Sequence, residues 1–157
     1  MKPTTWQDSK GNQWNCKINL SDCIRLKESN GFDLMNPRDF ERMLQDTMKQ
    51  IETIAELLRP QWERQGMNYL QFIDILIEEE GRFEQVQSAF AAAIENFSQS
   101  IGKKAIAVLV RKTMGTIKAL EEKALNRVES KEVEEKLQQL IEKADRQLAE
   151  DLSKLGS

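Results

Sequence analysis

Histidine is absent from this sequence of 157 residues. Its absence removes the commonest general base at neutral pH and the commonest protein ligand for transition metals. Carboxylates can still catalyse when they are buried beside a partner charge. The one carboxylate cluster, three consecutive glutamates at residues 78–80, points its side chains in different directions around a helix and indicates solvated surface. We therefore expect no enzymatic activity, no metal site and no bound cofactor.

The cysteines are too few, and the glycines too scattered, to form a recognisable binding or catalytic motif. The two cysteines, Cys16 and Cys23, cannot build a disulfide framework or a four-ligand zinc site. We interpret them as small core residues, with a redox pair as the alternative. The seven glycines form neither a phosphate-binding loop nor a dinucleotide-binding turn.

Long apolar runs are missing as well. No run approaches the ~20 residues of a membrane span, and the first residues lack the apolar core of a secretory signal. The net charge of −3 argues against a general nucleic-acid-binding protein. The hydrophobic fraction of 39% is enough for one modest core, and we expect the remaining residues to form polar helical surface. We expect a cytoplasmic protein with no membrane partner.

Residues 4–20, TTWQDSKGNQWNCKINL, alternate apolar and polar side chains as a half-buried strand does. Asp8 and Gly11 suit a type I turn followed by a left-handed glycine, which closes a β-hairpin. That register places Trp6 opposite Trp14. The apolar face of the second strand comprises Trp14, Cys16, Ile18 and Leu20.

A two-stranded hairpin is marginally stable by itself in water. We therefore expect it to cover a helical core, with Trp6 and Trp14 buried. The alternative is that an uncovered strand edge pairs with another subunit.

Capping signals then begin a series of helices. Ser21 is the predicted N-cap of a short helix over residues 22–29, and Gly31 is its left-handed stop. Asn36 caps the next helix, with Pro37 in its first position.

Apolar residues recur at helical spacing from there to about residue 100. We expect Pro60 to interrupt the first stretch and Gly66 to end it. Asn68 caps the second stretch and Gly81 ends it. The stripes comprise Phe40, Leu44, Met48, Ile51, Ala55, Leu58 and Trp62; then Leu70, Ile73 and Ile77 on one side; then Phe83, Val86, Phe90, Ile94 and Phe97.

The composition changes after Phe97, the last aromatic residue. Apolar residues then step by three and four, close to a heptad seam, and Ser130 is a position where the helix can restart. We expect these stripes to meet each other, a second subunit or a client. The candidate partner-binding residues are Ile106, Val110, Ile117, Leu120, Leu137, Leu140 and Leu148.

Residues 101–120 contain five basic residues and no acidic one. Lys104, Arg111 and Lys118 are seven apart and share one helix face. A solvated or subunit-facing surface is the interpretation we favour for this basic face. Contact with nucleic-acid phosphates is the alternative.

The sequence thus predicts a mainly α-helical protein. Residues 1–100 form an N-terminal β-hairpin packed on a small helical core domain. Residues 101–157 form a charged extension of long amphipathic helices, as one helix or a helical hairpin. We expect a homo-oligomer, of which the symmetric dimer is the commonest case.

The order of these elements and a few anchor residues resemble small phage and prophage tail proteins known as tail assembly chaperones. The resemblance covers about residues 4–100. After residue 110 the chain departs from the shorter members by its added charged helices. The matching positions are Trp6, Gly11, Trp14, Ile18 and Leu20; Arg25, Gly31, Asp33 and Leu34; Leu57, Pro60, Gln61 and Gly66; Phe72; and the A…AI.NF pattern that ends at Phe97.

This resemblance implies a non-enzymatic assembly factor of the host bacterial cytoplasm. It implies that the protein binds and solubilises the long helical tape measure protein, with the major tail protein as a further partner, and that it is absent from the mature virion. Two other functions stay open: a helical adaptor or coiled-coil oligomerisation protein, and a DNA-binding regulator that uses the basic face.

Overall fold

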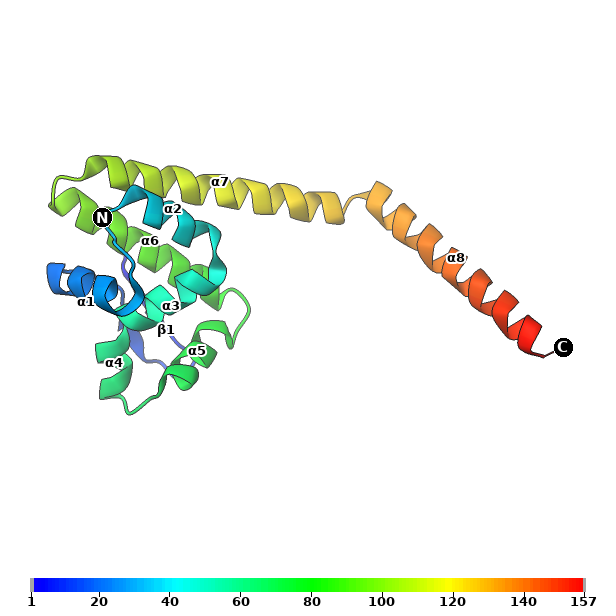
Figure 1. Ribbon diagram of the computed structural model, residues 1–157, viewed down its shortest axis with the longest axis horizontal. Coiled ribbons are helices and arrows are strands. Elements are labelled where there is room, and N and C mark those ends of the chain that lie inside the picture. Colours follow the sequence, from blue (N-terminus) through cyan, green and yellow to red (C-terminus); the bar gives the residue numbers. More distant parts are fainter. Residues whose placement is uncertain (1, 157) are drawn as a thin grey trace. The chain divides into compact units, whose positions relative to one another are not determined.

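The computed structural model describes residues 2–156 and confirms a mainly α-helical fold with an N-terminal β-hairpin (Figure 1). The chain forms two compact units, the first ending at Gly115 and the second beginning at Thr116. No helix in the described residues is long and apolar enough to cross a membrane. The elements are β1 (Thr5–Gln7), β2 (Gln13–Asn15), α1 (Leu20–Asn30), α2 (Pro37–Gln45), α3 (Thr47–Leu57), α4 (Arg59–Arg64), α5 (Tyr69–Ile77), α6 (Arg82–Ser100), α7 (Lys104–Val128) and α8 (Lys131–Leu155).

The hairpin has the predicted register, with Trp6 paired to Trp14 across antiparallel β1 and β2. Its turn is also as predicted. The Gly11 N–H donates to the Asp8 carbonyl at 3.1 Å, and Gly11 has the left-handed φ of 85°. A side chain at this φ would be strained, which explains the glycine.

The carboxylate of Asp8 organises the loop. It accepts hydrogen bonds from the backbone N–H groups of Lys10 and Asn12, both at 2.9 Å, and from the Trp14 indole Nε1 at 3.0 Å. Burial opposes ionisation of Asp8, but these bonds favour the charged form, and the pKa of Asp8 lies below its ordinary value of 3.8. The loop therefore holds the Trp14 ring in place through its polar edge.

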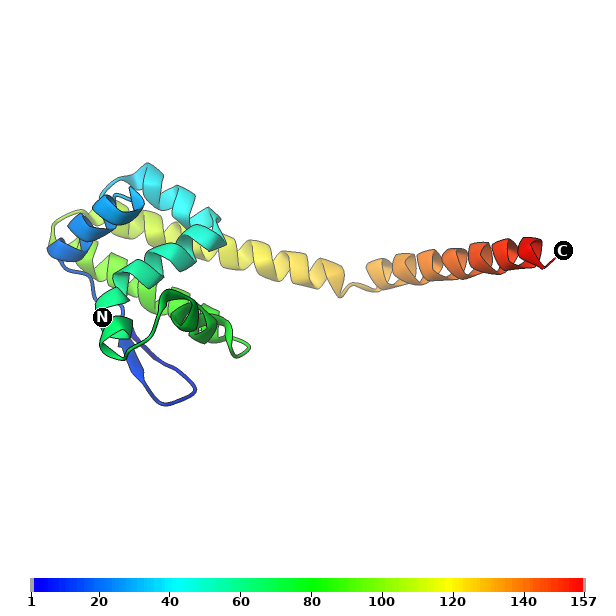
Figure 2. The same cartoon turned by 60° about the horizontal axis from the view of Figure 1, so that its bottom comes forward.

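The two tryptophans are buried, as predicted, and Trp14 has no exposed surface. Their rings stack at 5.7 Å between centroids, and the Phe72 ring of α5 lies 5.0 Å from that of Trp14. The Trp62 ring of α4 also stacks on Phe72, at 6.2 Å between centroids. Figure 2 shows the hairpin alongside the helices of the first unit. The hairpin is thus a core lid of this unit.

The first helix begins earlier than the sequence predicted. Its N-cap is Asn19, which forms a reciprocal capping box with Asp22, and Ser21 lies within the helix. Leu20 is consequently exposed in the first helical turn instead of extending the apolar face of the strand. Gly31 ends the helix in the left-handed conformation, as predicted.

The apolar stretch that starts at Asn36 is broken at two places. The predicted interruption near Pro60 occurs, because α3 ends at Leu57 and α4 begins at Arg59. A second break, which the stripe did not predict, lies at Asp46. Its side chain accepts hydrogen bonds from the backbone N–H groups of Met48, at 3.1 Å, and Lys49, at 3.2 Å, and so caps α3.

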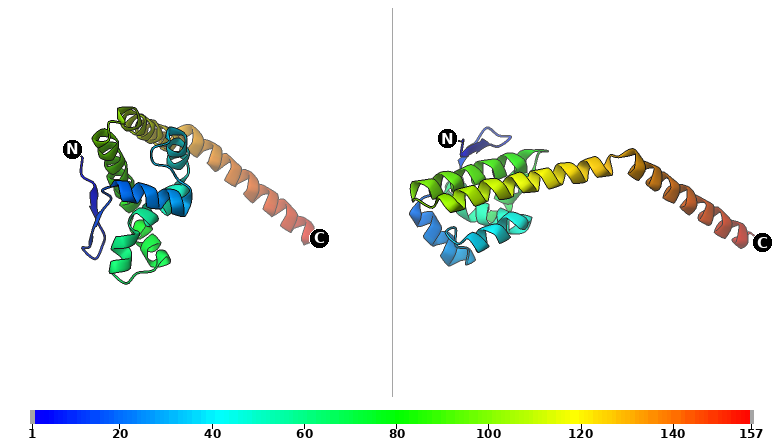
Figure 3. Two further views of the ribbon diagram at one scale, coloured as in Figure 1. Left: turned by 60° about the vertical axis from the view of Figure 1, so that its left-hand side comes forward. Right: turned by 90° about the horizontal axis from the view of Figure 1, so that it is seen from above.

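The beginning of α7 belongs to the first unit. Ile106, Ala107 and Val110 are buried there, and Figure 3 shows α7 starting beside α6. The composition changes near residue 100, but the packed unit continues to Gly115 because this turn of α7 supplies core side chains.

The second unit contains the remainder of α7 and all of α8. Ser130 caps α8, as predicted, by accepting from the Val133 N–H at 3.4 Å. The α8 helix is 25 residues long, and none of these described residues is buried.

Candidate partner-binding surfaces

The α8 helix carries a continuous exposed apolar surface, which we call the α8 stripe. Its leucine and isoleucine side chains have exposed fractions between 52% and 83%, and Val133 is half-buried. The stripe comprises Val133, Leu137, Leu140, Ile141, Ala144, Leu148, Leu152 and Leu155.

The α8 stripe has an 11-residue repeat. Leu137 recurs as Leu148, and Ile141 recurs as Leu152. Eleven residues are close to three whole helical turns, within about 20°. The stripe therefore follows the helix axis for its whole length, which suits contact with another long helix.

The predicted partner-binding residues differ in exposure. Ile106 and Val110 belong to the core of the first unit, and Val110 is only 1% exposed. Our prediction of a partner-facing role is wrong for these two, because neighbouring side chains already cover them. Ile117 is half-buried. The exposed members are Leu120, Leu137, Leu140 and Leu148.

The predicted basic face lies on α7, where Lys104, Arg111 and Lys118 are exposed. Arg111 is engaged within the first unit, since its Nε donates to the Glu95 carboxylate at 2.9 Å. The ammonium group of Lys2 lies 3.6 Å from the same carboxylate. One of the three predicted basic residues thus has a structural role.

Glu95 is itself buried. Burial opposes its ionisation, but the hydrogen bond from Arg111 and the positive charges of Lys2 and Arg111 outweigh it. The pKa of Glu95 therefore lies below its ordinary value of 4.5. This ion pair ties the start of α7 to α6.

Both cysteines are buried free thiols. Burial raises the pKa of Cys16 to about 12. Burial is the main cause that raises the pKa of Cys23 to about 11, and the negative charges of Asp22 and Asp33 add to it. These environments stabilise the neutral thiols, which fits the role of small core residues.

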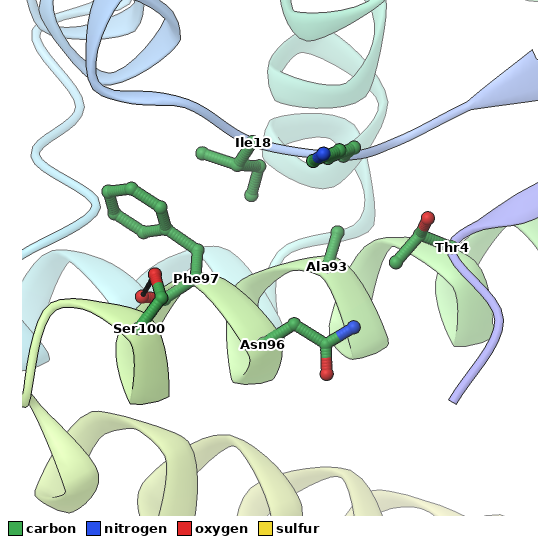
Figure 4. A pocket seen from close by; sticks show the side chains of 7 residues that line it. Thr4, Ile18, Ala93, Asn96, Phe97 and Ser100 are labelled. Carbon is green, nitrogen blue, oxygen red and sulfur yellow. Dashed lines mark hydrogen bonds between the residues drawn. The ribbon is translucent and has the colours of Figure 1, made fainter. Parts of the chain in front are cut away.

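One pocket of about 320 Å³ lies between α6 and the chain that flanks the hairpin (Figure 4). Ile18, Ala93 and Phe97 provide its apolar wall, and Asn96 and Ser100 lie on its rim. The volume is at the lower limit of small-ligand pockets.

The residues that carry the family resemblance are mainly structural. Arg25 donates to two carbonyl groups at the end of α3, at 3.2 and 3.0 Å. Gly31 and Gly66 have positive φ angles of 66° and 72°. Phe72 is at the centre of the aromatic core. These residues therefore stabilise the fold of the first unit.

The α5 helix has a second exposed apolar surface, which its apolar spacing alone did not predict. Leu70 and Ile77 share one side of α5, as expected from their spacing, but they are 70% and 59% exposed. The core side of α5 consists of Phe72, Ile75 and Leu76. We define the α5 apolar face as Tyr69, Leu70, Ile73 and Ile77.

Within residues 2–156, no group of three or more histidine, cysteine, aspartate or glutamate side chains is placed to hold a metal ion. Comparisons with protein-family models, with curated proteins and with solved structures find no match to this chain.

Proposed function

We propose that this protein is a non-enzymatic assembly factor that binds a long amphipathic helical client through the α8 stripe. The observation that carries the proposal is the exposure of all the leucine and isoleucine side chains of the stripe along a 25-residue helix. The layout of residues 4–100 supports a more specific form of it. In that form the protein is a tail assembly chaperone, and its client is the tape measure protein.

The uncovered side chains of the α8 stripe are large enough to stabilise a complex when a partner buries them. Burial of a leucine or isoleucine side chain contributes roughly 1.5–3 kcal/mol relative to exposure. Leu137, Ile141, Leu148 and Leu152 are all exposed and repeat along one side of α8. A client helix with apolar residues at three- and four-residue spacing would cover them.

The remaining sides of α8 are highly charged, with both signs interspersed. Glu132 and Lys136, for example, form an ion pair at 3.3 Å. Such a surface favours solubility of the complex and influences encounter rates more than affinity. A chaperone that keeps an apolar helical client in solution needs this combination.

Self-association through the same stripe is the second candidate function, and the 11-residue repeat favours it. Two copies of a helix with this repeat can pair as a coiled coil with a right-handed supercoil. In that case the protein would be a helical oligomerisation module, and the α8 stripe would be occupied by another copy.

Co-expression with a tape measure protein tests the proposal. The full-length double variant Leu137→Asp/Leu148→Asp places two charges in the α8 stripe. The matched control, Gln139→Asp/Ser153→Asp, places two aspartates on the opposite side of the same helix, so that the lower helix propensity of aspartate is common to both.

We expect the amount of soluble client to fall at least tenfold with the stripe variant and to stay unchanged with the control. Light scattering on each purified protein determines the oligomeric state. Equal client solubility with both variants would contradict the proposal. Loss of an oligomer by the stripe variant, with client solubility unchanged, would identify self-association as the function of the stripe.

A further inference from the structure

The α5 apolar face is a second surface of the first unit that the fold leaves largely uncovered, since Tyr69, Leu70 and Ile77 are exposed and Ile73 is half-buried. Tyr69, Leu70, Ile73 and Ile77 extend over two helical turns, a length of about 12 Å. The adjoining side of the same helix packs against the core, because Phe72 and Leu76 have no exposed surface. The exposure is therefore specific to one side of α5.

The surroundings of this face are acidic. From residue 68 to residue 81 the chain contains Asp74 and the three glutamates 78–80, and it contains no lysine or arginine. Asp74 is exposed one residue after Ile73. Glu52 of α3 lies close to Tyr69, and its negative charge adds to burial in raising the pKa of that phenol.

One of these carboxylates is neutralised within the chain, because Glu79 pairs with Arg82 at 2.9 Å. The Glu78 carboxylate accepts hydrogen bonds from Ser9 in the hairpin loop and keeps its charge. Asp74 and Glu52 remain beside the apolar residues. The face thus combines large apolar side chains with a negatively charged border.

We propose that the α5 apolar face binds an amphipathic helix of a partner protein whose apolar stripe is flanked by lysine or arginine. Apolar side chains at three- and four-residue spacing would cover Leu70, Ile73 and Ile77. The basic residues would lie opposite Asp74 and Glu52, and opposite charges across an interface favour the correct partner and speed its encounter. This surface is separate from the α8 stripe and would operate whether or not α8 binds a client.

The probes are two synthetic helical peptides of about 18 residues with leucines at the same i, i+3, i+4 and i+7 positions. Lysines flank the leucines in one peptide and glutamates in the other. The titrated proteins are the full-length chain, the variant Leu70→Gln/Ile77→Gln, and the control Leu140→Gln/Leu148→Gln on α8. All four substituted side chains are exposed, so we expect each variant to retain the melting temperature of the unmodified protein.

We expect the lysine peptide to bind at least tenfold more tightly than the glutamate peptide, and more weakly as salt is added. The α5 variant should weaken that binding at least tenfold, whereas the α8 control should leave it unchanged. Equal binding of the two peptides would overturn the proposal, as would loss of binding in the α8 control only. Conversion of an oligomer to a monomer by the α5 variant, with peptide binding unaffected, would assign the face to a second copy and also overturn it.

Discussion

The side chain of Gln61 completes the hydrogen bonding of Asn15 on the outer edge of β2. The Asn15 N–H donates to Gln61 Oε1 at 3.0 Å, and Gln61 Nε2 donates to the Asn15 carbonyl at 2.8 Å. One amide side chain from α4 thus replaces the neighbour that a third strand would supply. At this residue the edge is closed to another chain.

Replacement of Gln61 by glutamate should destabilise the first unit. A carboxylate cannot donate to the Asn15 carbonyl, so one of the two hydrogen bonds is lost. In its place a charged carboxylate oxygen faces the carbonyl oxygen of Asn15 and repels it. We expect a loss of about 1–2 kcal/mol in the free energy of unfolding, measured by urea denaturation at pH 7. The same substitution at exposed Gln138 of α8 is the control. An equal change in both variants would show that the clamp on β2 contributes nothing specific.

Truncation of Trp14 should be among the most damaging changes in the chain. Its ring is fully buried between Trp6 and Phe72, and large aromatic truncations in a core cost about 3–5 kcal/mol. We expect Trp14→Ala to lower the melting temperature by ten degrees or more, on the order of the shift that this loss implies for a domain of this size. A melting temperature within one or two degrees of the unmodified protein would show that the hairpin is not a core lid.

The hairpin was predictable because its signals are local and agree with each other. The alternation of side chains sets the faces of the strands, and the spacing of Asp8 and Gly11 sets the turn, so the pairing of Trp6 with Trp14 follows. The caps at Asn36 and Asn68 were predictable for the same reason.

The core side of α5 was not predictable from periodicity, because this helix is apolar on more than one side. Leu70, Ile73 and Ile77 have helical spacing, and so do Phe72, Ile75 and Leu76. Phe72 decides between them, since its ring packs between Trp14 and Trp62. That contact joins residues far apart in the sequence, and it leaves Leu70 and Ile77 in solvent.

The role of Ile106 and Val110 was misjudged for a related reason. Their stripe is continuous in sequence with that of Ile117 and Leu120 along α7. Nothing local marks Gly115, where the first unit ends. Burial of one part of a continuous stripe depends on the neighbouring helices, and the exposed remainder is the part that stays a candidate site.

Acid should weaken the link between α6 and α7 through Glu95. The folded-state pKa of Glu95 lies below its ordinary value of 4.5, so its charge stabilises the fold above that value. This stability is lost as the pH falls through the lower folded-state pKa. We expect Glu95→Gln to be less stable than the unmodified protein at pH 7 and the difference to shrink below about pH 4.

The partner of Glu95 provides the complementary test. In the variant Arg111→Gln, Glu95 stays buried but loses the guanidinium that donates to its carboxylate. We therefore expect the pKa of Glu95 to rise, and NMR titration of its side-chain carboxyl measures this change. An unchanged pKa would mean that Arg111 does not stabilise this carboxylate in solution. Lys104→Gln, on the same helix, is a control that should leave the pKa of Glu95 in place.

The two thiols should be almost unreactive in the folded protein. The pKa of Cys16 is raised to about 12 and that of Cys23 to about 11, both by burial first. Very little thiolate is present at pH 7–8, and the thiolate is the reactive form. We expect labelling by a thiol reagent to be at least a hundredfold slower in buffer than in denaturant. Rapid labelling of Cys23 in the native state would instead indicate a redox-accessible thiol.

Amide hydrogen exchange along α8, with and without a co-purified tape measure protein, is the most direct test of whether the α8 stripe binds a helical client. An isolated helix without buried side chains exchanges rapidly, and contact with a client along the α8 stripe should protect its backbone. We expect residues 131–155 to gain at least tenfold protection in the complex, and Leu137→Asp/Leu148→Asp to abolish the gain. Protection confined to residues 2–115, with exchange along α8 unchanged, would contradict this expectation.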